Sequence, residues 1–285
     1  MRKRRNGAAA LCLAAVLLCL AVTAAYTVVF IWSDDTRPPV ISMTSDTLEV
    51  SVSAGDAELL AGVTAMDARD GDVTADILIQ GVSNLSEGTA VVTYAAFDDA
   101  GNVAKATRTL HYTDYEPPRL ALDGALVFNA NTSMDVLGRV RATDVVDGDI
   151  SRQVKADLVS NTGSLAYPGI HEVEFRVTNS LGDTTHLTLP VEVIPMGDYN
   201  ATAVLKDYLV YLPQGSGFSA RDYLKGLTMG INGELRSDLS EMDVRIDGSV
   251  NTDVPGVYSV CYTVSCTRGT MRYVGYTRLN VVVEG

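Results

Sequence analysis

Short runs of alternating apolar and polar residues fill most of the chain after residue 33. Over residues 187–193 every odd-numbered position is apolar and none of the even-numbered positions is an aliphatic or aromatic residue. A period of two is typical of a strand with one buried face. Residues 88–97 and 256–264 repeat the pattern, and we expect their core-facing positions to be Val92, Tyr94, Ala96, Val260, Tyr262 and Val264.

The first 33 residues follow a different pattern. A basic cluster at residues 2–5 precedes an uncharged, mostly apolar stretch from Gly7 to Trp32, and two aspartates follow. Such a stretch is long enough to cross a hydrocarbon core of about 30 Å as a helix. Basic residues favour the cytoplasmic side. We therefore predict a cytoplasmic tail at 1–6, one transmembrane helix at 7–32, and everything beyond it outside the cell membrane.

A cleaved secretory signal is the alternative for this segment. Its apolar core would span only about 7 to 15 residues before a site of small residues, and Val22–Ala25 could serve as that site. The apolar run continues to Trp32, where an aromatic anchor at the membrane interface belongs. The uncleaved anchor is the favoured interpretation, and cleavage stays open.

Self-comparison reveals repeats with a period of about 80 residues. The pair Pro38-Pro39 recurs as Pro117-Pro118, and the segment 65–74 with its Asp-Gly-Asp recurs at 142–151. A more divergent third copy keeps the glycine and aromatic spacing of the strand at 88–94. Six or seven short strands in about 80 residues indicate an antiparallel sandwich. We predict an all-β fold of three tandem Ig-like sandwiches at 37–115, 116–196 and 197–285 (the third divergent), preceded by the transmembrane helix.

The first copy resembles the bacterial immunoglobulin-like repeat first described in pesticidal crystal proteins. The motifs that carry the resemblance are Pro38-Pro39, Gly62–Thr74, Gly88–Tyr94, Asp98–Asn102 and Thr107–Thr109. The second copy keeps fewer of them, and the third keeps mainly the strand at 256–262. The resemblance implies a small β-sandwich used as a spacer or binding module on the surface of Gram-positive bacteria, with no known catalysis.

Clustered carboxylates are the sharpest candidate for a site. The two loops of the first copy carry Asp67, Asp70, Asp72, Asp98, Asp99 and Asn102, and those of the second carry Asp144, Asp147, Asp149, Asn179 and Asp183. Ca²⁺ takes six to eight oxygen ligands, but Asp and Asn also form turns by accepting backbone N–H groups. We expect turns, and hence no metal site and no cofactor, while calcium binding at 67–72 and 144–149 stays open.

Catalytic chemistry is not indicated. His111, His171 and His186 fall in or beside strand patterns, and none of them precedes a Gly-x-Ser-x-Gly turn or lies in a His-Glu-x-x-His motif. Cys261 and Cys266 are five residues apart, which places them on opposite faces of one strand and disfavours a bridge between them. We expect no catalytic residues and no enzyme activity.

Charge and tyrosine are spread unevenly. Residues 34–196 carry 10 basic and 25 acidic side chains, whereas residues 197–285 carry 8 and 10. The acidic excess opposes nucleic-acid binding. Eight of the 13 tyrosines lie in residues 197–285, and tyrosine suits recognition surfaces, although these tyrosines could also be ordinary core and strand residues.

Together these patterns predict a membrane-anchored bacterial surface protein whose sandwiches act as spacer, adhesion or ligand-binding modules. Residues 197–285 would be the binding tip, and the partner would be an unidentified surface protein or glycan. The alternatives are the ectodomain subunit of a signalling or envelope complex and an accessory protein to a surface enzyme.

Overall fold

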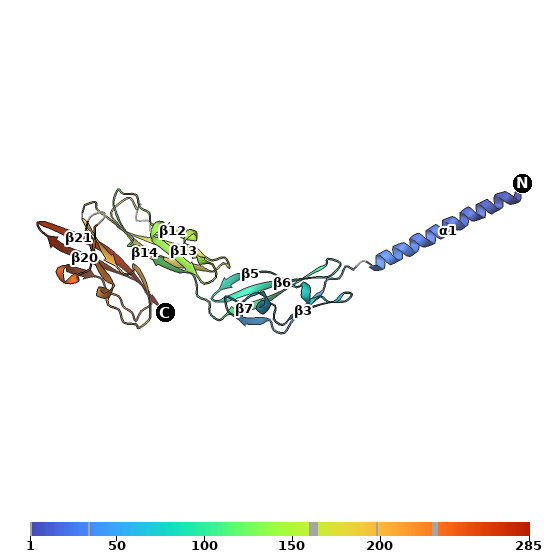
Figure 1. Ribbon diagram of the computed structural model, residues 1–285, viewed down its shortest axis with the longest axis horizontal. Helices are drawn as coiled ribbons and strands as arrows, with labels where there is room; N and C mark the ends of the chain where they lie inside the picture. Colours follow the sequence, from blue (N-terminus) through green and yellow to red (C-terminus); the bar gives the residue numbers. More distant parts are fainter. Residues whose placement is uncertain (1, 34, 160–164, 198, 230–232) are drawn as a thin grey trace. The chain divides into compact units, whose positions relative to one another are not determined.

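The computed structural model describes residues 2–33, 35–159, 165–197, 199–229 and 233–285 (Figure 1). Helix α1 spans Arg2–Ser33, close to the predicted 7–32. Its segment Leu11–Val28 is long and apolar enough to cross a membrane, and none of that segment is buried against the rest of the protein. Beyond α1, the described part of the chain is built from β-strands, one four-residue helix and short 3₁₀ turns. The prediction of an all-β fold preceded by one apolar helix is confirmed.

The chain divides into two compact units. Unit 1 comprises residues 1–83 and 89–113, and unit 2 comprises residues 84–88 and 114–285. The predicted boundaries at 115/116 and 196/197 fall between strands β7 and β8 and between β14 and β15. The division into three domains stays a prediction, because the second and third repeats lie together in unit 2.

Unit 1 is a two-layer β-structure. One sheet has the strand order β1-β3-β4, and the other has the order β2-β7-β6-β5, with β2 parallel to β7. The elements are β1 (Val40–Met43), β2 (Thr47–Val50), α2 (Asp56–Leu59), β3 (Val63–Asp67), β4 (Gly71–Asp72), β5 (Leu78–Ser86), β6 (Thr89–Phe97) and β7 (Val103–Tyr112).

The core of unit 1 follows the alternation in the sequence. Val92, Tyr94 and Ala96 of β6 are fully buried, as predicted. A buried phenol needs a hydrogen-bond partner, and the Tyr94 hydroxyl donates to the backbone carbonyl of Leu59 at 2.6 Å. This bond ties β6 to the end of α2.

Unit 2 repeats this arrangement twice. Its first part has sheets β8-β10-β11 and β9-β14-β13-β12, with β9 parallel to β14. The strands of this part are β8 (Arg119–Leu122), β9 (Val127–Asn129), β10 (Val140–Asp144), β11 (Gly148–Asp149), β12 (Lys155–Leu158), β13 (Gly169–Thr178) and β14 (Thr184–Ile194).

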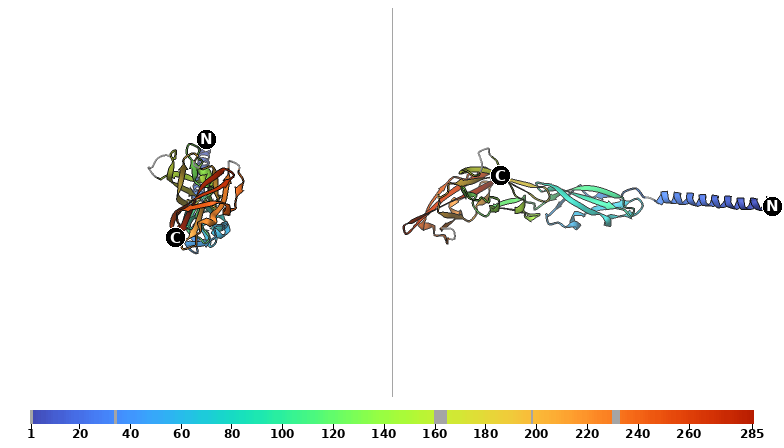
Figure 2. Two further views of the ribbon diagram at one scale, coloured as in Figure 1. Left: turned by 90° about the vertical axis from the view of Figure 1, so that its left-hand side faces the viewer. Right: turned by 90° about the horizontal axis from the view of Figure 1, so that it is seen from above.

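The last part of unit 2 has the same strand order, but its two layers are joined into one sheet. Strands β15-β17-β18 and β16-β21-β20-β19 correspond to the two sheets of the earlier copies, and β15 also pairs in parallel with the long strand β21. The long hairpin of β20 and β21 is coloured orange to red in Figure 2. The strands are β15 (Ala201–Leu205), β16 (Leu209–Pro213), β17 (Leu224–Met229), β18 (Leu235–Arg236), β19 (Asp243–Asp247), β20 (Gly256–Arg268) and β21 (Met271–Glu284).

A glycine permits this join. Ala201 of β15 pairs with Gly275 of β21, and a Cβ at Gly275 would lie 2.6 Å from the Ala203 backbone nitrogen and 2.5 Å from a methyl carbon of Leu227. Only glycine allows the two strands to approach so closely.

Two hydrophobic clusters form the core of unit 2, and they adjoin. One is built from strands β8 to β14 around Phe175, and the other from strands β15 to β21 around Tyr262. Leu209 of β16 belongs to the first cluster although it lies in the third repeat, and Tyr208 packs against both. The second and third repeats therefore share buried apolar surface.

Candidate functional site

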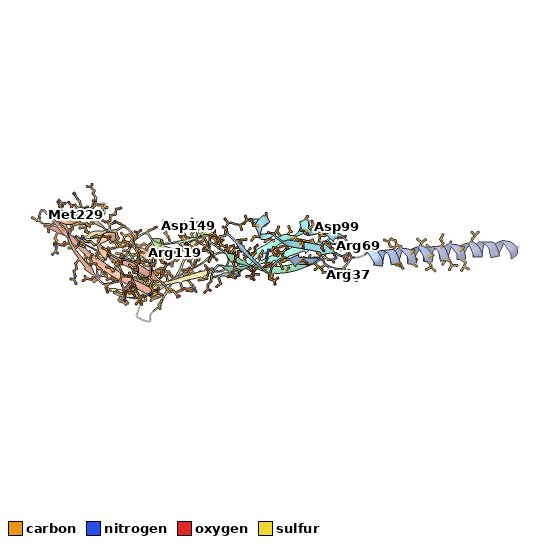
Figure 3. All side chains as sticks on the ribbon, turned by 90° about the horizontal axis from the view of Figure 1, so that it is seen from below. Arg37, Arg69, Asp99, Arg119, Asp149 and Met229 are labelled. Carbon is orange, nitrogen blue, oxygen red and sulfur yellow. The ribbon has the colours of Figure 1, made fainter. Side chains whose placement is uncertain are left out.

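Three segments of unit 1 bring carboxylates together. Asp35 follows α1, Asp67 ends β3, and Asp98 follows β6. Each offers an oxygen, and these three oxygens lie within 4.8 Å of one another. Figure 3 labels a neighbour on each segment, namely Arg37, Arg69 and Asp99, and they gather at one end of the unit. We call Asp35, Asp67 and Asp98 the carboxylate cluster.

Asp67 is the most buried member of the cluster, at 6% exposure. Its Oδ1 accepts hydrogen bonds from the backbone N–H groups of Asp70 at 3.0 Å and Arg69 at 2.7 Å. These bonds favour the charged form, so they lower the pKa of the Asp67 carboxyl below its ordinary value. Its Oδ2 is buried and has no hydrogen-bond partner.

Asp98 and Asp35 are held by neighbouring backbone and amide groups. Asp98 is 7% exposed and accepts from the backbone N–H and the side-chain amide of Asn102, both at 2.7 Å. The same amide donates to the backbone carbonyl of Asp35 at 3.1 Å. The Arg37 backbone N–H donates to the Asp35 carboxylate at 3.0 Å. Asn102 therefore links the segment after α1 to the β6–β7 loop.

The other loop aspartates of unit 1 form turns, as expected. The Asp70 carboxylate accepts from the Asp99 backbone N–H at 3.0 Å, which joins the two loops. The Asp72 carboxylate accepts from the Thr74 backbone N–H at 3.0 Å, and its hydrogen bonds with Thr74 lower the pKa of Asp72. Sequence reasoning missed Asp35, because nothing in the local pattern indicates that a residue 32 positions before Asp67 joins these loops.

The second copy contains the same turns with a different centre. Asp147 accepts from the backbone N–H of Ser180 at 2.6 Å, as Asp70 does from Asp99. At the centre, Asn179 stands where the first copy has Asp98, and its amide donates to Asp144 Oδ2 at 3.3 Å. The carboxylate oxygen that corresponds to the unpartnered oxygen of Asp67 therefore has a donor here.

A tyrosine completes this second centre. The Tyr115 hydroxyl accepts from the Asn179 amide at 3.1 Å and donates to the Asp183 carboxylate at 2.6 Å. Burial and the Asp183 carboxylate both raise the pKa of Tyr115, so it stays a neutral donor. The remaining loop residue, Asp149, accepts from the Ser151 backbone N–H at 3.0 Å and forms a turn.

The histidines lie in strands and contact their immediate neighbours. His111 is exposed and lies 3.2 Å from the Thr89 hydroxyl, and His186 is exposed and 3.5 Å from a Glu174 carboxylate oxygen. His171 differs from the expected surface position because it is only 4% exposed. The alternation of β13 places its odd-numbered side chains inward, so the imidazole is buried with the valines of that strand.

The two cysteines outside α1 lie on β20 as free thiols. Cys266 is buried and Cys261 is partly exposed, which is the opposite-face placement that their spacing predicts.

A buried polar network joins the second and third repeats. Arg278 of β21 is 6% exposed and forms an ion pair with Glu192 of β14. Glu192 also accepts from the Tyr276 hydroxyl at 2.8 Å, and Arg278 donates to the Ser259 hydroxyl at 2.7 Å. Burial raises the pKa of Tyr276, and hydrogen bonds with Cys261 and Glu192 raise it further.

Further polar contacts support this junction within unit 2. Tyr211 of β16 donates to the backbone carbonyl of Leu120 at 3.0 Å, and Arg119 forms an exposed ion pair with Glu284 at 2.8 Å. The Arg119 guanidinium also lies 4.9 Å from the centre of the Tyr211 ring.

Most of the tyrosines of residues 197–285 are used in packing rather than displayed. Tyr262 is fully buried and donates to the Ala220 carbonyl at 2.8 Å. Tyr208 packs between the two clusters, and Tyr223 stacks on Phe218. The abundance of tyrosine therefore does not by itself indicate a binding tip.

One open groove of about 680 Å³ lies in unit 2 beside this junction. Tyr199 and Tyr276 stack there with ring centres 5.3 Å apart. The remaining lining mixes amide, hydroxyl, aliphatic and aromatic groups, such as Asn129, Asn200 and Thr277, with two charged side chains, Asp123 and Arg139. An aromatic face beside amides is a surface on which a polar ligand can lie.

Comparison with known proteins gives distant relatives only. No protein-family model matches the chain. It is 26% identical over 182 residues to an 81.3 kDa protein of Acholeplasma phage L2, which covers 62% of this chain and 23% of the relative. It is 29% identical over 147 residues to the pesticidal crystal protein Cry22Aa of Bacillus thuringiensis, which covers 50% of this chain and 18% of the relative. The chain therefore spans less than a quarter of either relative.

Solved structures with tandem β-domains also match. The CBM51-2 and INT domains of Clostridium perfringens ZmpB, solved in complex with GlcNAc, match with a TM-score of 0.22 and 14% identity, covering 86% of this chain and 41% of that one. The protocadherin GammaB4 extracellular domain matches with a TM-score of 0.20 and 11% identity, covering 87% and 49%. At these scores the matches carry no argument about function. The distant similarity to a pesticidal crystal protein agrees with the resemblance seen in the sequence.

Proposed function

We propose that this chain is a membrane-anchored bacterial surface protein and that its β-sandwiches serve as a non-enzymatic spacer and ligand-binding module. One observation carries the proposal. An apolar helix whose segment Leu11–Val28 is not buried precedes two compact β-units, and most side chains that could suggest chemistry form turns, core contacts or the junction within unit 2. We assign the repeats to the bacterial immunoglobulin-like family, supported by the motifs of the first copy and the distant similarity to Cry22Aa.

The anchor has a physical basis in α1. Apolar side chains along Leu11–Val28 are not covered by the rest of the protein. Exposing them to water costs free energy, and a hydrocarbon environment removes that cost. The basic residues at 2–5 favour a cytoplasmic N-terminus, and we infer from this that both β-units lie outside the cell.

The ligand-binding part of the proposal rests on unit 2. Residues 34–196 carry a strong acidic excess, which disfavours nucleic acids and other polyanions as partners. The groove at Tyr199 and Tyr276 combines stacked aromatic rings with amide and hydroxyl groups and one side chain of each charge, Asp123 and Arg139, so a polar glycan or a surface protein is the partner class that fits it.

Surface display tests the anchor. The full chain with a C-terminal epitope is expressed in a Gram-positive host, and membranes are washed at alkaline pH. We expect the epitope in the membrane pellet, at full length, and sensitive to protease added to intact cells. The double variant Leu17→Arg with Leu20→Arg should release the chain from the membrane, whereas Ser33→Arg at the helix end should not. A shortened wild-type chain in the medium would show that the segment is a cleaved signal.

Ligand binding is tested by screening glycans and surface proteins with the intact chain in nanodiscs. Point variants are required here, because deleting residues 197–285 would remove Leu209 from the first hydrophobic cluster and expose that core. We expect Tyr199→Ala to weaken the binding of any specific ligand. Tyr273 lies outside the groove lining, so Tyr273→Ala should leave that binding unchanged. A membrane partner with a cytoplasmic domain, recovered by pull-down, would favour the signalling alternative.

A further inference from the structure

The carboxylate cluster of unit 1 has a feature that turn formation leaves unexplained. Carboxylates this close repel one another unless a proton or a cation compensates them. The Arg69 charge acts on Asp67, but the Asp67 Oδ2 atom is buried without a hydrogen-bond partner. A buried, unpartnered acceptor costs free energy and calls for a specific explanation.

The second copy shows how the same site is satisfied internally. There Asn179 replaces one carboxylate by an amide that donates to Asp144 Oδ2 at 3.3 Å, and Tyr115 donates to Asp183 at 2.6 Å. The first copy has Asp98 in place of the amide and Thr36 in place of the tyrosine. Among the described residues, the only group of three ligand-type side chains close enough to share an ion is the one in the first copy.

The spacing of the cluster fits calcium. Ca²⁺ binds oxygens at about 2.3 to 2.6 Å, so two oxygens on opposite sides of one ion are about 4.6 to 5.2 Å apart. The three cluster oxygens lie within 4.8 Å of one another, which is close enough for one ion to be shared among them.

We propose that Asp35, Asp67 and Asp98 bind one Ca²⁺ ion, with water completing its shell, and that the second copy does not. The positive ion compensates the negative charge on Asp67 Oδ2, which has no hydrogen-bond donor. It thereby does for Asp67 what the Asn179 amide does for Asp144 in the second copy. It also fastens the segment at Asp35, two residues beyond the end of α1, to the β3–β4 and β6–β7 loops. This assignment replaces the expectation that the first-copy loops are turns alone.

The full chain, in nanodiscs or detergent, is first treated with a chelator to remove bound cations. Calorimetric titration with CaCl₂ then tests the proposal. We expect one site per chain with an affinity of about 0.1 to 1 mM, as in extracellular calcium modules, and a higher melting temperature of unit 1 in 10 mM CaCl₂ than in chelator. Asp35→Asn retains an oxygen that can accept from the Arg37 N–H, so the variant should fold. Its affinity for Ca²⁺ should be at least tenfold weaker than that of the wild type. Asp98→Asn, which reproduces the chemistry of the second copy, should do the same.

Two matched controls make the test specific. Asp99→Asn removes a charge from the adjacent position of the same loop and should change the affinity less than about threefold, since screened charges outside the shell contribute weakly. Asp144→Asn alters the second copy and should leave one site per chain. No heat and no thermal shift in the wild type up to 10 mM CaCl₂, equal weakening by Asp99→Asn, or loss of binding in Asp144→Asn would each overturn the proposal. The anchor test above is independent of all of these results.

Discussion

Removing one member of the Arg278–Glu192 pair should destabilise unit 2 strongly. Arg278 is 6% exposed and the Glu192 side chain is 16% exposed, so neither charge is well solvated. The variant Arg278→Met leaves the largely buried Glu192 carboxylate with the Tyr276 hydroxyl as its remaining partner among the contacts described. Breaking one side of a buried pair typically costs about 3 to 5 kcal/mol, which for a unit of this size corresponds to about 6 to 20 °C in melting temperature.

The assay is thermal and urea unfolding of the full chain in detergent, followed by circular dichroism. The double variant Arg278→Met with Glu192→Leu should recover much of the loss, because no unpaired charge remains buried. Arg141→Met serves as the control, since its pair with Asp123 is exposed (56% and 50%) and should matter little. If Arg278→Met behaves like Arg141→Met, the pair does not join the two repeats as inferred.

Three further predictions address the cores and the acidic loops. Tyr94→Phe removes the donor to a buried carbonyl and should lower the stability of unit 1 by about 1 to 2 kcal/mol, measured by urea unfolding. Gly275→Ala should destabilise unit 2 by about 1 to 3 kcal/mol through overpacking, whereas Gly217→Ala, where a Cβ meets nothing within 4 Å, should be nearly neutral by thermal melting. The folded pKa of Asp67 is lowered from 3.8, so the stability that its carboxylate contributes is present above that value and is lost as the pH falls through the lowered pKa. Acid unfolding of Asp67→Asn in chelator should therefore show a shallower loss of stability below about pH 4 than the wild type shows.

The core positions were predictable because alternation alone decides which side chains face inward. Val92, Tyr94 and Tyr262 are buried as the period of two requires. Pro190 shows the limit of this reasoning. The alternation over residues 187–193 places this even-numbered position on the polar, solvent-facing side, yet Pro190 is buried, and it pairs with Glu172 of β13 just before the parallel pairing with β9 begins at Glu192. The local pattern cannot show which layer covers the second face of a strand.

The site was less predictable than the fold, for a different physical reason. The aspartates of the two first-copy loops could be listed from the sequence, and their turns follow from local hydrogen bonding. Asp35 enters the cluster only through the fold, since the Asn102 amide holds its segment against the loops. The interpretation of the tyrosines as a recognition surface likewise depended on which side chains face the junction in unit 2, and Tyr211 and Tyr276 turn out to bond across it.

The central claim is that the β-part of the chain consists of two folding units, the second of which unites two repeats through a shared core and the Arg278–Glu192 pair. Differential scanning calorimetry of the full chain in detergent tests it directly. We expect two unfolding transitions, with Arg278→Met lowering only the one that belongs to unit 2. Three separate transitions would show that the repeats of unit 2 fold independently, and one transition lowered as a whole would show that the two units are not separate.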